Sequence, residues 1–182
     1  MSTNLHNILP RSHLTWLDAK PAKGDAARMK QDIDETDAFG ASLSNRLAFR
    51  LYQCANLLHK TGSRAVESEG LTTQQWAVLG ALSHPNRQGG ISINELARYL
   101  KVSRQNLTGV LGRMERDGHI CAVADKNDRR SRLIQMTDSG RDVWTMQATP
   151  KIHAFYDQAL SDFSMDDITH ALHYLLKLLA NM

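Results

Sequence analysis

The sequence contains few cysteines, few aromatic residues and no long apolar run. Its two cysteines, Cys54 and Cys121, lie in unrelated contexts and do not have the spacing of a metal-binding or redox pair. No apolar segment approaches the ~20 residues of a membrane-spanning helix, and residues 1–11 lack the charged-then-apolar order of a secretory signal. We therefore expect a cytoplasmic protein with reduced thiols and no membrane segment.

Net charge is also small, but it is unevenly distributed. The 182 residues carry a net charge of only +3. Residues 91–136 hold nine lysines and arginines against five acidic residues, whereas residues 137–182 hold three against six. A basic central block favours a polyanionic partner, although an ordinary solvated surface could show the same division.

Helical periodicity begins after a polar segment that spans residues 1–40. From Leu43 to Leu58, apolar residues recur at a spacing of four, which predicts a first long helix. The last helix is predicted to begin at Ser164, and it carries leucines at positions 172, 175, 176 and 179. Because the centre of the chain cannot easily cover both apolar faces, we expect a dimer interface built from the two ends.

Three helices in the centre of the chain begin with the same capping signal. Thr72, Ser92 and Ser103 each precede an apolar-periodic segment, and the first two have a Gln or Glu three residues further on. The helix after Ser92 can extend only to about Leu100 before the next one starts. Two short helices joined by such a turn form a helix-turn-helix.

The second helix of this pair has one apolar face and ends at Gly118, a residue suited to the left-handed position after a helix. Leu107, Val110, Leu111 and Met114 are predicted to point inward. The glycines on its outer face cost helix stability, and they either permit close approach to a partner or are simply tolerated there. The outward-facing residues are Arg104, Gln105, Thr108, Gly109, Gly112 and Arg113.

After this helix the hydrophobic period changes to two. Residues 120–124 and 132–136 are predicted as the strands of a basic two-stranded wing. A further helix begins at Thr137, and Pro150 is expected to kink it. The predicted fold class is mainly α with a small β-wing. Its parts are an N-terminal extension (1–40), a helical dimerisation region (41–70 and 138–182) and a winged helix-turn-helix DNA-binding domain (71–137).

A helix-turn-helix followed by a basic wing is typical of DNA-binding proteins, whose recognition helix enters the roughly 12 Å wide major groove. Arg104 can donate to guanine, Gln105 and Asn106 can pair with adenine, and Thr108 can contact a thymine methyl. Arg113 is placed to hold a phosphate. The candidate DNA-binding residues of this helix are Ser103, Arg104, Gln105, Asn106, Thr108 and Arg113.

Three arginines fall within four residues at the tip of the predicted wing, namely Arg129, Arg130 and Arg132. Such a tip suits the narrow minor groove, whose negative potential attracts guanidinium groups. Asp128 could accept a bidentate hydrogen bond that fixes the direction of Arg130. Asp128, Arg129 and Arg130 are therefore candidate DNA-binding residues, and a plain charged loop is the alternative.

These features resemble the MarR (multiple antibiotic resistance regulator) family over roughly residues 43 to 180. The resemblance rests on residues 71–79, on the turn at 125–132 and on the Thr-x-x-Gly pattern at 137–140. It implies a homodimeric winged-helix transcription regulator in which Arg130 enters the minor groove and Asp128 anchors it. The segments 102–107 and 114–119 are similar to a subgroup that governs aromatic-acid degradation, with hydroxycinnamates and their CoA thioesters as inducers.

A small-molecule effector is expected between the first long helix, the helix after Thr72 and the helix after the wing. Trp76 offers a ring for stacking, and Arg46 and Arg50 offer anion partners unless they form an ordinary charged surface. Family analogy places Thr73 and Trp76 opposite the first helix. The candidate effector-binding residues are Arg46, Arg50, Gln53, Asn56, Thr73 and Trp76.

Other chemistry is less well supported. No nucleophile–base–acid arrangement or phosphate-binding glycine loop is present, so we expect neither an enzyme nor a cofactor. Asp166, His170 and His173 have metal-ligand spacing but lack a distant fourth ligand, which favours solvated or interface histidines and no metal.

We therefore predict a repressor that binds double-stranded DNA at a pseudo-palindromic operator and is released by an aromatic acid or its CoA thioester. One alternative is a thiol-based redox regulator that uses Cys54, a residue otherwise expected to be buried. A more distant alternative is a winged helix that serves only to bind other proteins.

Overall fold

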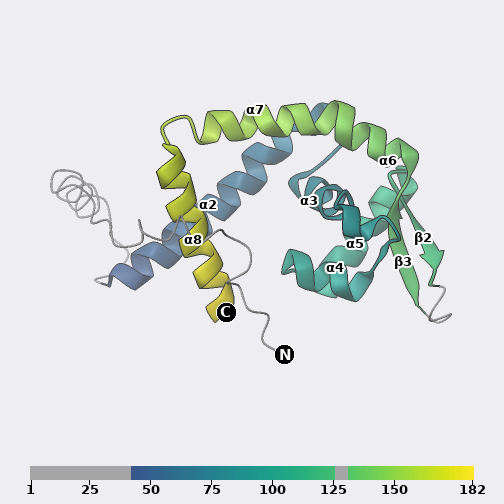
Figure 1. Ribbon diagram of the computed structural model, residues 1–182, viewed down its shortest axis with the longest axis horizontal. Coiled ribbons are helices and arrows are strands. Elements are labelled where there is room, and N and C mark those ends of the chain that lie inside the picture. Colours follow the sequence, from purple (N-terminus) through teal and green to yellow (C-terminus); the bar gives the residue numbers. More distant parts are fainter. Residues whose placement is uncertain (1–41, 126–130) are drawn as a thin grey trace. The chain divides into compact units, whose positions relative to one another are not determined.

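The computed structural model describes residues 42–125 and 131–182, which fold mainly into helices with one small antiparallel sheet (Figure 1). The chain divides into two units, residues 1–51 and 52–182, and every element from α3 onward lies in the second. The expected fold class, mainly helical with a small β-wing, is confirmed.

The bounds of the elements are as follows. The helices are α2 (Leu43–Ala65), α3 (Thr73–Leu82), α4 (Ile93–Leu100), α5 (Arg104–Arg116), α6 (Asp138–Asp142), α7 (Thr149–Ala159) and α8 (Met165–Asn181). Short 3-10 turns occupy Glu67–Glu69 and Pro85–Arg87, and a π-helical stretch spans Val143–Ala148. The strands are β1 (Ile91–Ser92), β2 (Ile120–Ala124) and β3 (Arg132–Met136).

Side-chain hydrogen bonds start four helices at the predicted residues. The hydroxyls of Thr72, Ser92, Ser103 and Ser164 each accept a hydrogen bond from the backbone N–H three residues further on. At Thr72, Ser92 and Ser164 the reciprocal bond of a capping box is also present. These caps satisfy backbone donors that the first turn of a helix leaves without a partner, so they determine where each helix begins.

The wing has three strands, which corrects the expected two. β1 pairs antiparallel with β3, with Ile91 opposite Ile134, and the strand order is β1-β3-β2. The two residues of β1 are too few to show strand periodicity, and Ser92 also caps α4, so the sequence does not reveal this strand. β2 and β3 have the predicted bounds.

The core lies between α3, α4, α5 and the sheet. Leu79 in α3, Leu96 in α4 and Met114 in α5 are fully buried. The other residues of the predicted inward face of α5, Leu107, Val110 and Leu111, are buried as well. Because α5 is held along one whole face, its opposite face stays open for a partner.

The end of α5 is joined to the start of α6 through backbone groups. Gly118 adopts a left-handed φ of 77° after α5. Thr137 donates from its N–H to the His119 carbonyl (3.1 Å) and from its hydroxyl to the Gly118 carbonyl (2.6 Å). A Cβ at Gly140 would lie 2.0 Å from the His119 carbonyl oxygen, a separation that only glycine permits. The Thr-x-x-Gly pattern thus has a packing reason.

The irregularity expected at Pro150 lies in the turns before it. Proline has no N–H and crowds the carbonyl four residues earlier, which an α-helix interior does not accommodate. Here the six residues Val143–Ala148 form a π-helical stretch, and the Thr149 hydroxyl donates to the Trp144 carbonyl (2.7 Å). The helical run therefore passes from α6 into α7 through a widened turn.

We predict that Gly140→Ala lowers the free energy of unfolding by at least about 2 kcal/mol, because the added methyl group meets backbone that cannot move aside. Gly109→Ala is the matched control. A Cβ there meets nothing within 4 Å, so the change is expected to raise stability by up to about 1 kcal/mol. Urea unfolding measures both, and a Gly140→Ala variant as stable as the unmodified chain would contradict the proposed contact.

Candidate DNA-binding and effector sites

The outer face of α5 carries the predicted DNA-reading residues. Arg104, Gln105, Thr108 and Arg113 are all exposed. The Thr108 hydroxyl donates a hydrogen bond to the Arg104 carbonyl (2.8 Å). Because the hydroxyl proton is used within the helix, the methyl group is the part of the side chain left for an apolar contact. Such a methyl group suits the predicted contact with thymine. Ser103 caps the N-terminus of α5, since its hydroxyl accepts a hydrogen bond from the Asn106 N–H (3.2 Å).

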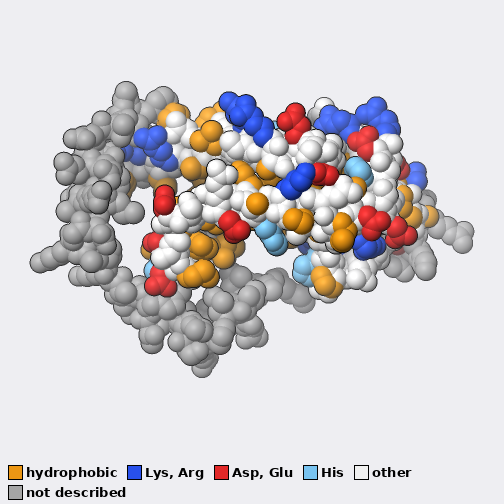
Figure 2. Space-filling view, turned by 90° about the horizontal axis from the view of Figure 1, so that it is seen from above, with side chains coloured by type: hydrophobic (Ala, Val, Ile, Leu, Met, Phe, Trp, Pro, Cys, Tyr) orange, Lys and Arg blue, Asp and Glu red, His pale blue; other side chains and the backbone are white. Residues whose placement is uncertain are grey.

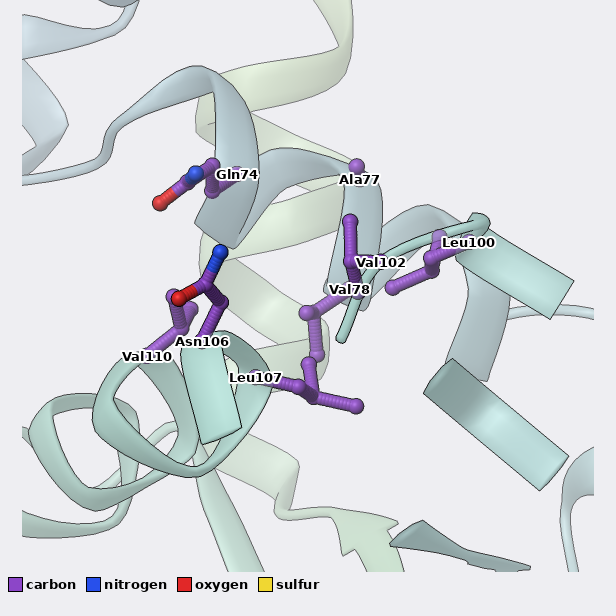
Figure 3. Close-up of a pocket in the computed structure, with 8 residues that line it drawn as sticks. All are labelled: Gln74, Ala77, Val78, Leu100, Val102, Asn106, Leu107 and Val110. Atoms are coloured by element: carbon purple, nitrogen blue, oxygen red, sulfur yellow. The ribbon is translucent and has the colours of Figure 1, made fainter. Parts of the chain in front are cut away.

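Asn106 has a different orientation from the other candidates. An apolar cavity of about 90 Å³ lies between α3 and α5, and Asn106 lines it together with Gln74, Val102 and Val110 (Figure 3). The side chain therefore faces α3 rather than the outer face of α5. The residue is nonetheless exposed to solvent, so it stays a candidate for contact with DNA.

Gly109 and Gly112 are not required by packing within the described part of the chain. A Cβ at either residue would meet nothing within 4 Å. Alanine would therefore fit at both positions and would favour the helix. Two interpretations of the glycines remain, close approach of DNA and simple tolerance on an exposed face.

The wing-tip candidates Asp128, Arg129 and Arg130 lie outside the described residues. The strands that lead to them are held by the Asp125 N–H, which donates to the Ser131 carbonyl (3.1 Å). Arg132 belongs to the hairpin itself, because its guanidinium donates to the Ala122 carbonyl (2.6 Å). Arg132 is thereby committed to the scaffold of the wing.

The six effector candidates are divided between the two units. Arg46 and Arg50 lie one turn apart on the part of α2 that belongs to the first unit. Gln53 and Asn56 lie on α2 within the second unit, as do Thr73 and Trp76 of α3.

Within the second unit, Thr73 ties α3 to α2. Its hydroxyl donates to the His59 carbonyl (2.8 Å), and its N–H donates to the Ser63 hydroxyl (3.0 Å). The Ser63 and Thr73 hydroxyls are themselves 2.9 Å apart. Thr73 therefore orients α3, and its hydroxyl already has partners.

Trp76 is the centre of an aromatic cluster that the sequence analysis did not assemble. It is 7% exposed and meets Phe155 and Tyr156 of α7 edge to face, at ring-centroid distances of 6.0 and 5.8 Å. A Cβ at Gly62 of α2 would lie 3.0 Å from its ring, so a side chain at this position would force the ring to shift. Burial raises the pKa of Tyr156 above its ordinary value. The Trp76 ring is thus packed inside this cluster and does not offer an open face on which a ligand could stack.

An open groove of about 740 Å³ runs beside this cluster, between α2 and α7. Its lining includes Phe155 together with two cations, Arg64 and Lys151. Lys151 contacts the Glu69 carboxylate and donates to the Ser68 hydroxyl (2.6 Å). The sequence does not reveal that these cations lie together, because they come from elements far apart in the chain. An apolar ring beside two cations is suited to an aromatic anion.

The candidate redox cysteine and the candidate metal ligands have local surroundings. Cys54 is exposed in the single chain, which corrects the expectation of a buried cysteine, because it lies on a face of α2 that the described residues leave uncovered. His170 Nδ1 lies 2.7 Å from the Asp166 carbonyl oxygen, so this pair makes a local helix contact. Across residues 42–125 and 131–182, no three His, Cys, Asp or Glu side chains gather as a metal site.

Comparison with known proteins connects this geometry to a family. Residues 69–131 match the MarR family. The transcriptional activatory protein BadR of Rhodopseudomonas palustris is 69% identical over 140 residues, which cover 77% of this chain and 80% of BadR. The chain belongs to the MarR family. It is therefore a DNA-binding transcription regulator.

Other relatives agree with this assignment. The homoprotocatechuate degradative operon repressor of Escherichia coli is 30% identical over 115 residues, covering 63% of this chain and 75% of the repressor. The fold is shared with CouR from Rhodococcus jostii RHA1 bound to p-coumaroyl-CoA (TM-score 0.64, 20% identity, 78% and 96% of the two chains). It is also shared with Sco3205 from Streptomyces coelicolor in complex with DNA (TM-score 0.65, 23% identity, 78% and 89%). None of the described helices is long and apolar enough to span a membrane.

The contact between Glu69 and Lys151 predicts a pH dependence. The hydrogen bond from Lys151 is the main cause that lowers the pKa of the Glu69 carboxyl below its ordinary value. The contact therefore stabilises the fold above that ordinary pKa, and the stabilisation is lost as the pH falls through the lowered pKa. We expect Glu69→Gln to lower Tm by about 1–2 °C at pH 7, a difference that shrinks as the pH falls below the ordinary pKa of a glutamate.

Thermal melts of both proteins across this pH range make the measurement. Glu115→Gln is the control, because Glu115 is an exposed carboxylate with no ion pair among the described residues. A difference between Glu69→Gln and the unmodified chain that stays constant from pH 7 to pH 3 would show that the carboxylate charge is not responsible.

Proposed function

We propose that this MarR-family regulator binds a pseudo-palindromic operator as a homodimer and that an aromatic carboxylate or its CoA thioester releases it. The observation that carries the proposal is the groove between α2 and α7, where Phe155 lies beside Arg64 and Lys151. The predicted residues Arg46, Arg50, Gln53, Asn56, Thr73 and Trp76 remain part of this hypothesis. Trp76 backs Phe155, so it would shape the aromatic wall without facing the ligand openly.

The named properties of relatives support this effector class. CouR was crystallised with p-coumaroyl-CoA, and the Escherichia coli relative is a repressor of homoprotocatechuate degradation. Both compounds combine an aromatic ring with a carboxylate or its thioester. BadR is named an activatory protein, so activation by the DNA-bound form is the second candidate for the direction of regulation.

Exposed apolar side chains support the dimer. On α8, Leu172, Leu175, Leu176 and Leu179 are 44–57% exposed, and Leu57 and Leu58 on α2 are 58% and 46% exposed. Figure 2 shows hydrophobic side chains open to solvent among charged ones. Rows of exposed leucines are typical of a protein–protein interface. We assign residues 41–70 and 138–182 to dimerisation and residues 71–137 to DNA binding.

The DNA contacts divide into two kinds. One kind reads base edges in the major groove, and the residues proposed for it are Arg104, Gln105, Asn106 and Thr108. In the minor groove, the proposed contact is Arg130, which Asp128 positions and Arg129 precedes in the sequence. Ser103 and Arg113 are proposed to face the phosphate backbone.

We predict that Arg130→Ala weakens operator binding by on the order of 1–3 kcal/mol, with a smaller effect on unrelated DNA, because a groove contact depends on sequence. Arg113→Ala is expected to weaken binding to all sequences alike and to reduce the slope of log affinity against log salt by about one. Fluorescence anisotropy with operator and scrambled duplexes separates the two. Equal behaviour of both variants would contradict this division of roles.

Release by the effector follows from linkage. A ligand that favours the non-binding arrangement of the two recognition helices by ~1–3 kcal/mol lowers DNA affinity by about 5- to 150-fold. By reciprocity, DNA must weaken the ligand by the same factor. A contact of the ligand with α7 is a direct way to act on α6 and the end of α5, since these helices are continuous or joined by backbone bonds.

We predict that an aromatic carboxylate or hydroxycinnamoyl-CoA binds at micromolar levels, less tightly in the presence of operator, and that free CoA does not substitute for it. Calorimetry with and without operator measures this coupling and also gives the stoichiometry, expected as two chains per operator. Arg64→Gln is expected to weaken the ligand about tenfold, because it removes a charge that lines the groove. Arg141→Gln on exposed α6 is the control.

Two outcomes would overturn this proposal. One is that no aromatic acid or thioester binds, and the other is that binding leaves DNA affinity unchanged. Peroxide that weakens DNA binding by the unmodified chain, but not by Cys54→Ser, would instead support the redox alternative, for which an exposed Cys54 is suitable.

A further inference from the structure

A group of basic side chains lies where α4 turns into α5, outside the set of predicted DNA-binding residues. A hollow of about 510 Å³ is lined there by Asn94, Ala97, Arg98, Lys101, Val102 and Arg104. Arg98, Lys101 and Arg104 are exposed. Within residues 42–125 and 131–182, the structure gives none of these three cations an ion-pair partner. The hollow therefore carries positive charge that the described residues do not neutralise.

The nearest acidic side chain along α4 is already occupied. Glu95 lies three residues before Arg98, but its carboxylate accepts hydrogen bonds from the Ser92 hydroxyl (2.6 Å) and N–H (3.2 Å). These bonds are the main cause that lowers the pKa of Glu95, and the charge of Arg98 contributes less. Glu95 thus serves the capping box of α4, and among the described residues the Arg98 guanidinium has no direct ion-pair partner.

Lys101 occupies a backbone conformation that favours glycine. Its φ of 57° and ψ of 37° are left-handed, and it is the one non-glycine residue with positive φ in the described part of the chain. The conformation closes α4, since the Lys101 N–H donates to the Arg98 carbonyl (3.3 Å) and the Val102 N–H to the Ala97 carbonyl (3.1 Å). A side chain here costs stability that glycine would not. The geometry of the turn therefore gives no reason for a lysine at this position.

We propose that this hollow binds a phosphate of the DNA backbone in each half-site, with Arg98 and Lys101 as its contacts. The proposal rests on DNA binding by α5, and it adds a contact that sets how α5 sits in the groove. Arg104 joins the hollow to the base-reading face, because it lines the hollow and is the first residue of α5. The first helix of a helix-turn-helix crosses the DNA backbone, which brings phosphates to this side of α5.

Two substitutions of Lys101 separate the strain from the charge. Lys101→Gln removes the charge and keeps the left-handed side chain, whereas Lys101→Gly removes both. Both variants are expected to bind operator about five- to tenfold more weakly at low salt. In both, the slope of log affinity against log salt concentration should become shallower by about 0.9 for each half-site. Only Lys101→Gly should raise Tm, by about 2–4 °C. Lys60→Gln, an exposed lysine of α2, is the charge control and should change neither quantity.

Anisotropy titrations at several salt concentrations and thermal melts give these values. Arg98→Gln should reproduce the loss of affinity and slope for operator and scrambled DNA alike. If Lys101→Gln and Arg98→Gln both bind within twofold of the unmodified chain and with its salt slope, the phosphate contact is wrong. If the unmodified chain itself shows no salt-dependent operator binding, DNA binding by α5 fails instead, so the two failures are distinguishable.

Discussion

The close approach of Gly140 to the His119 carbonyl is the contact on which the geometry of the proposed DNA-binding region depends. It brings the start of α6 against the end of α5 with no side chain between them. Thr137 adds hydrogen bonds to the carbonyls of Gly118 and His119, so the junction is made almost entirely of backbone. Since β2 begins at Ile120, directly after this junction, any displacement of α6 also acts on the wing.

The same helical run leads from this junction to the proposed effector groove. Trp144, in the π-helical stretch, packs on α3 so closely that a Cβ at Gly80 would lie 3.1 Å from its ring. Further along, Phe155 and Tyr156 of α7 meet Trp76 of α3. The helical run from α6 to α7 therefore contacts both the proposed groove and the end of α5.

The sequence predicts the features whose causes are local. Thr72, Ser92, Ser103 and Ser164 cap their helices because each bond spans only three residues, and the buried face of α5 follows from helical spacing alone. The exposed face of α5 also follows from this spacing, whereas the cavity that Asn106 lines depends on packing against α3.

Features that depend on contacts between distant parts of the chain cannot be predicted from the sequence. The third strand has two residues and is recognised only by its pairing with β3. Arg64 and Lys151 meet in one groove from helices separated by the whole winged domain. Trp76 looks like an exposed stacking surface in the sequence because its covering residues, Phe155 and Tyr156, come almost 80 positions later.

At three positions on or next to α5, the residue present is less stable than another residue type would be. In one case a side chain stands where glycine would be favoured, and in two cases glycine stands where a side chain would be favoured. Lys101 stands where glycine would be more stable, and Gly109 and Gly112 stand where alanine would be. Contacts within the described chain explain neither, because Lys101 has no ion-pair partner there and a Cβ at either glycine meets empty space. A long cation beside the helix and a bare backbone along it both suit a large, negatively charged partner lying against α5. The DNA contact proposed for Lys101 therefore also favours close approach of DNA, rather than simple tolerance, as the reason for the two glycines.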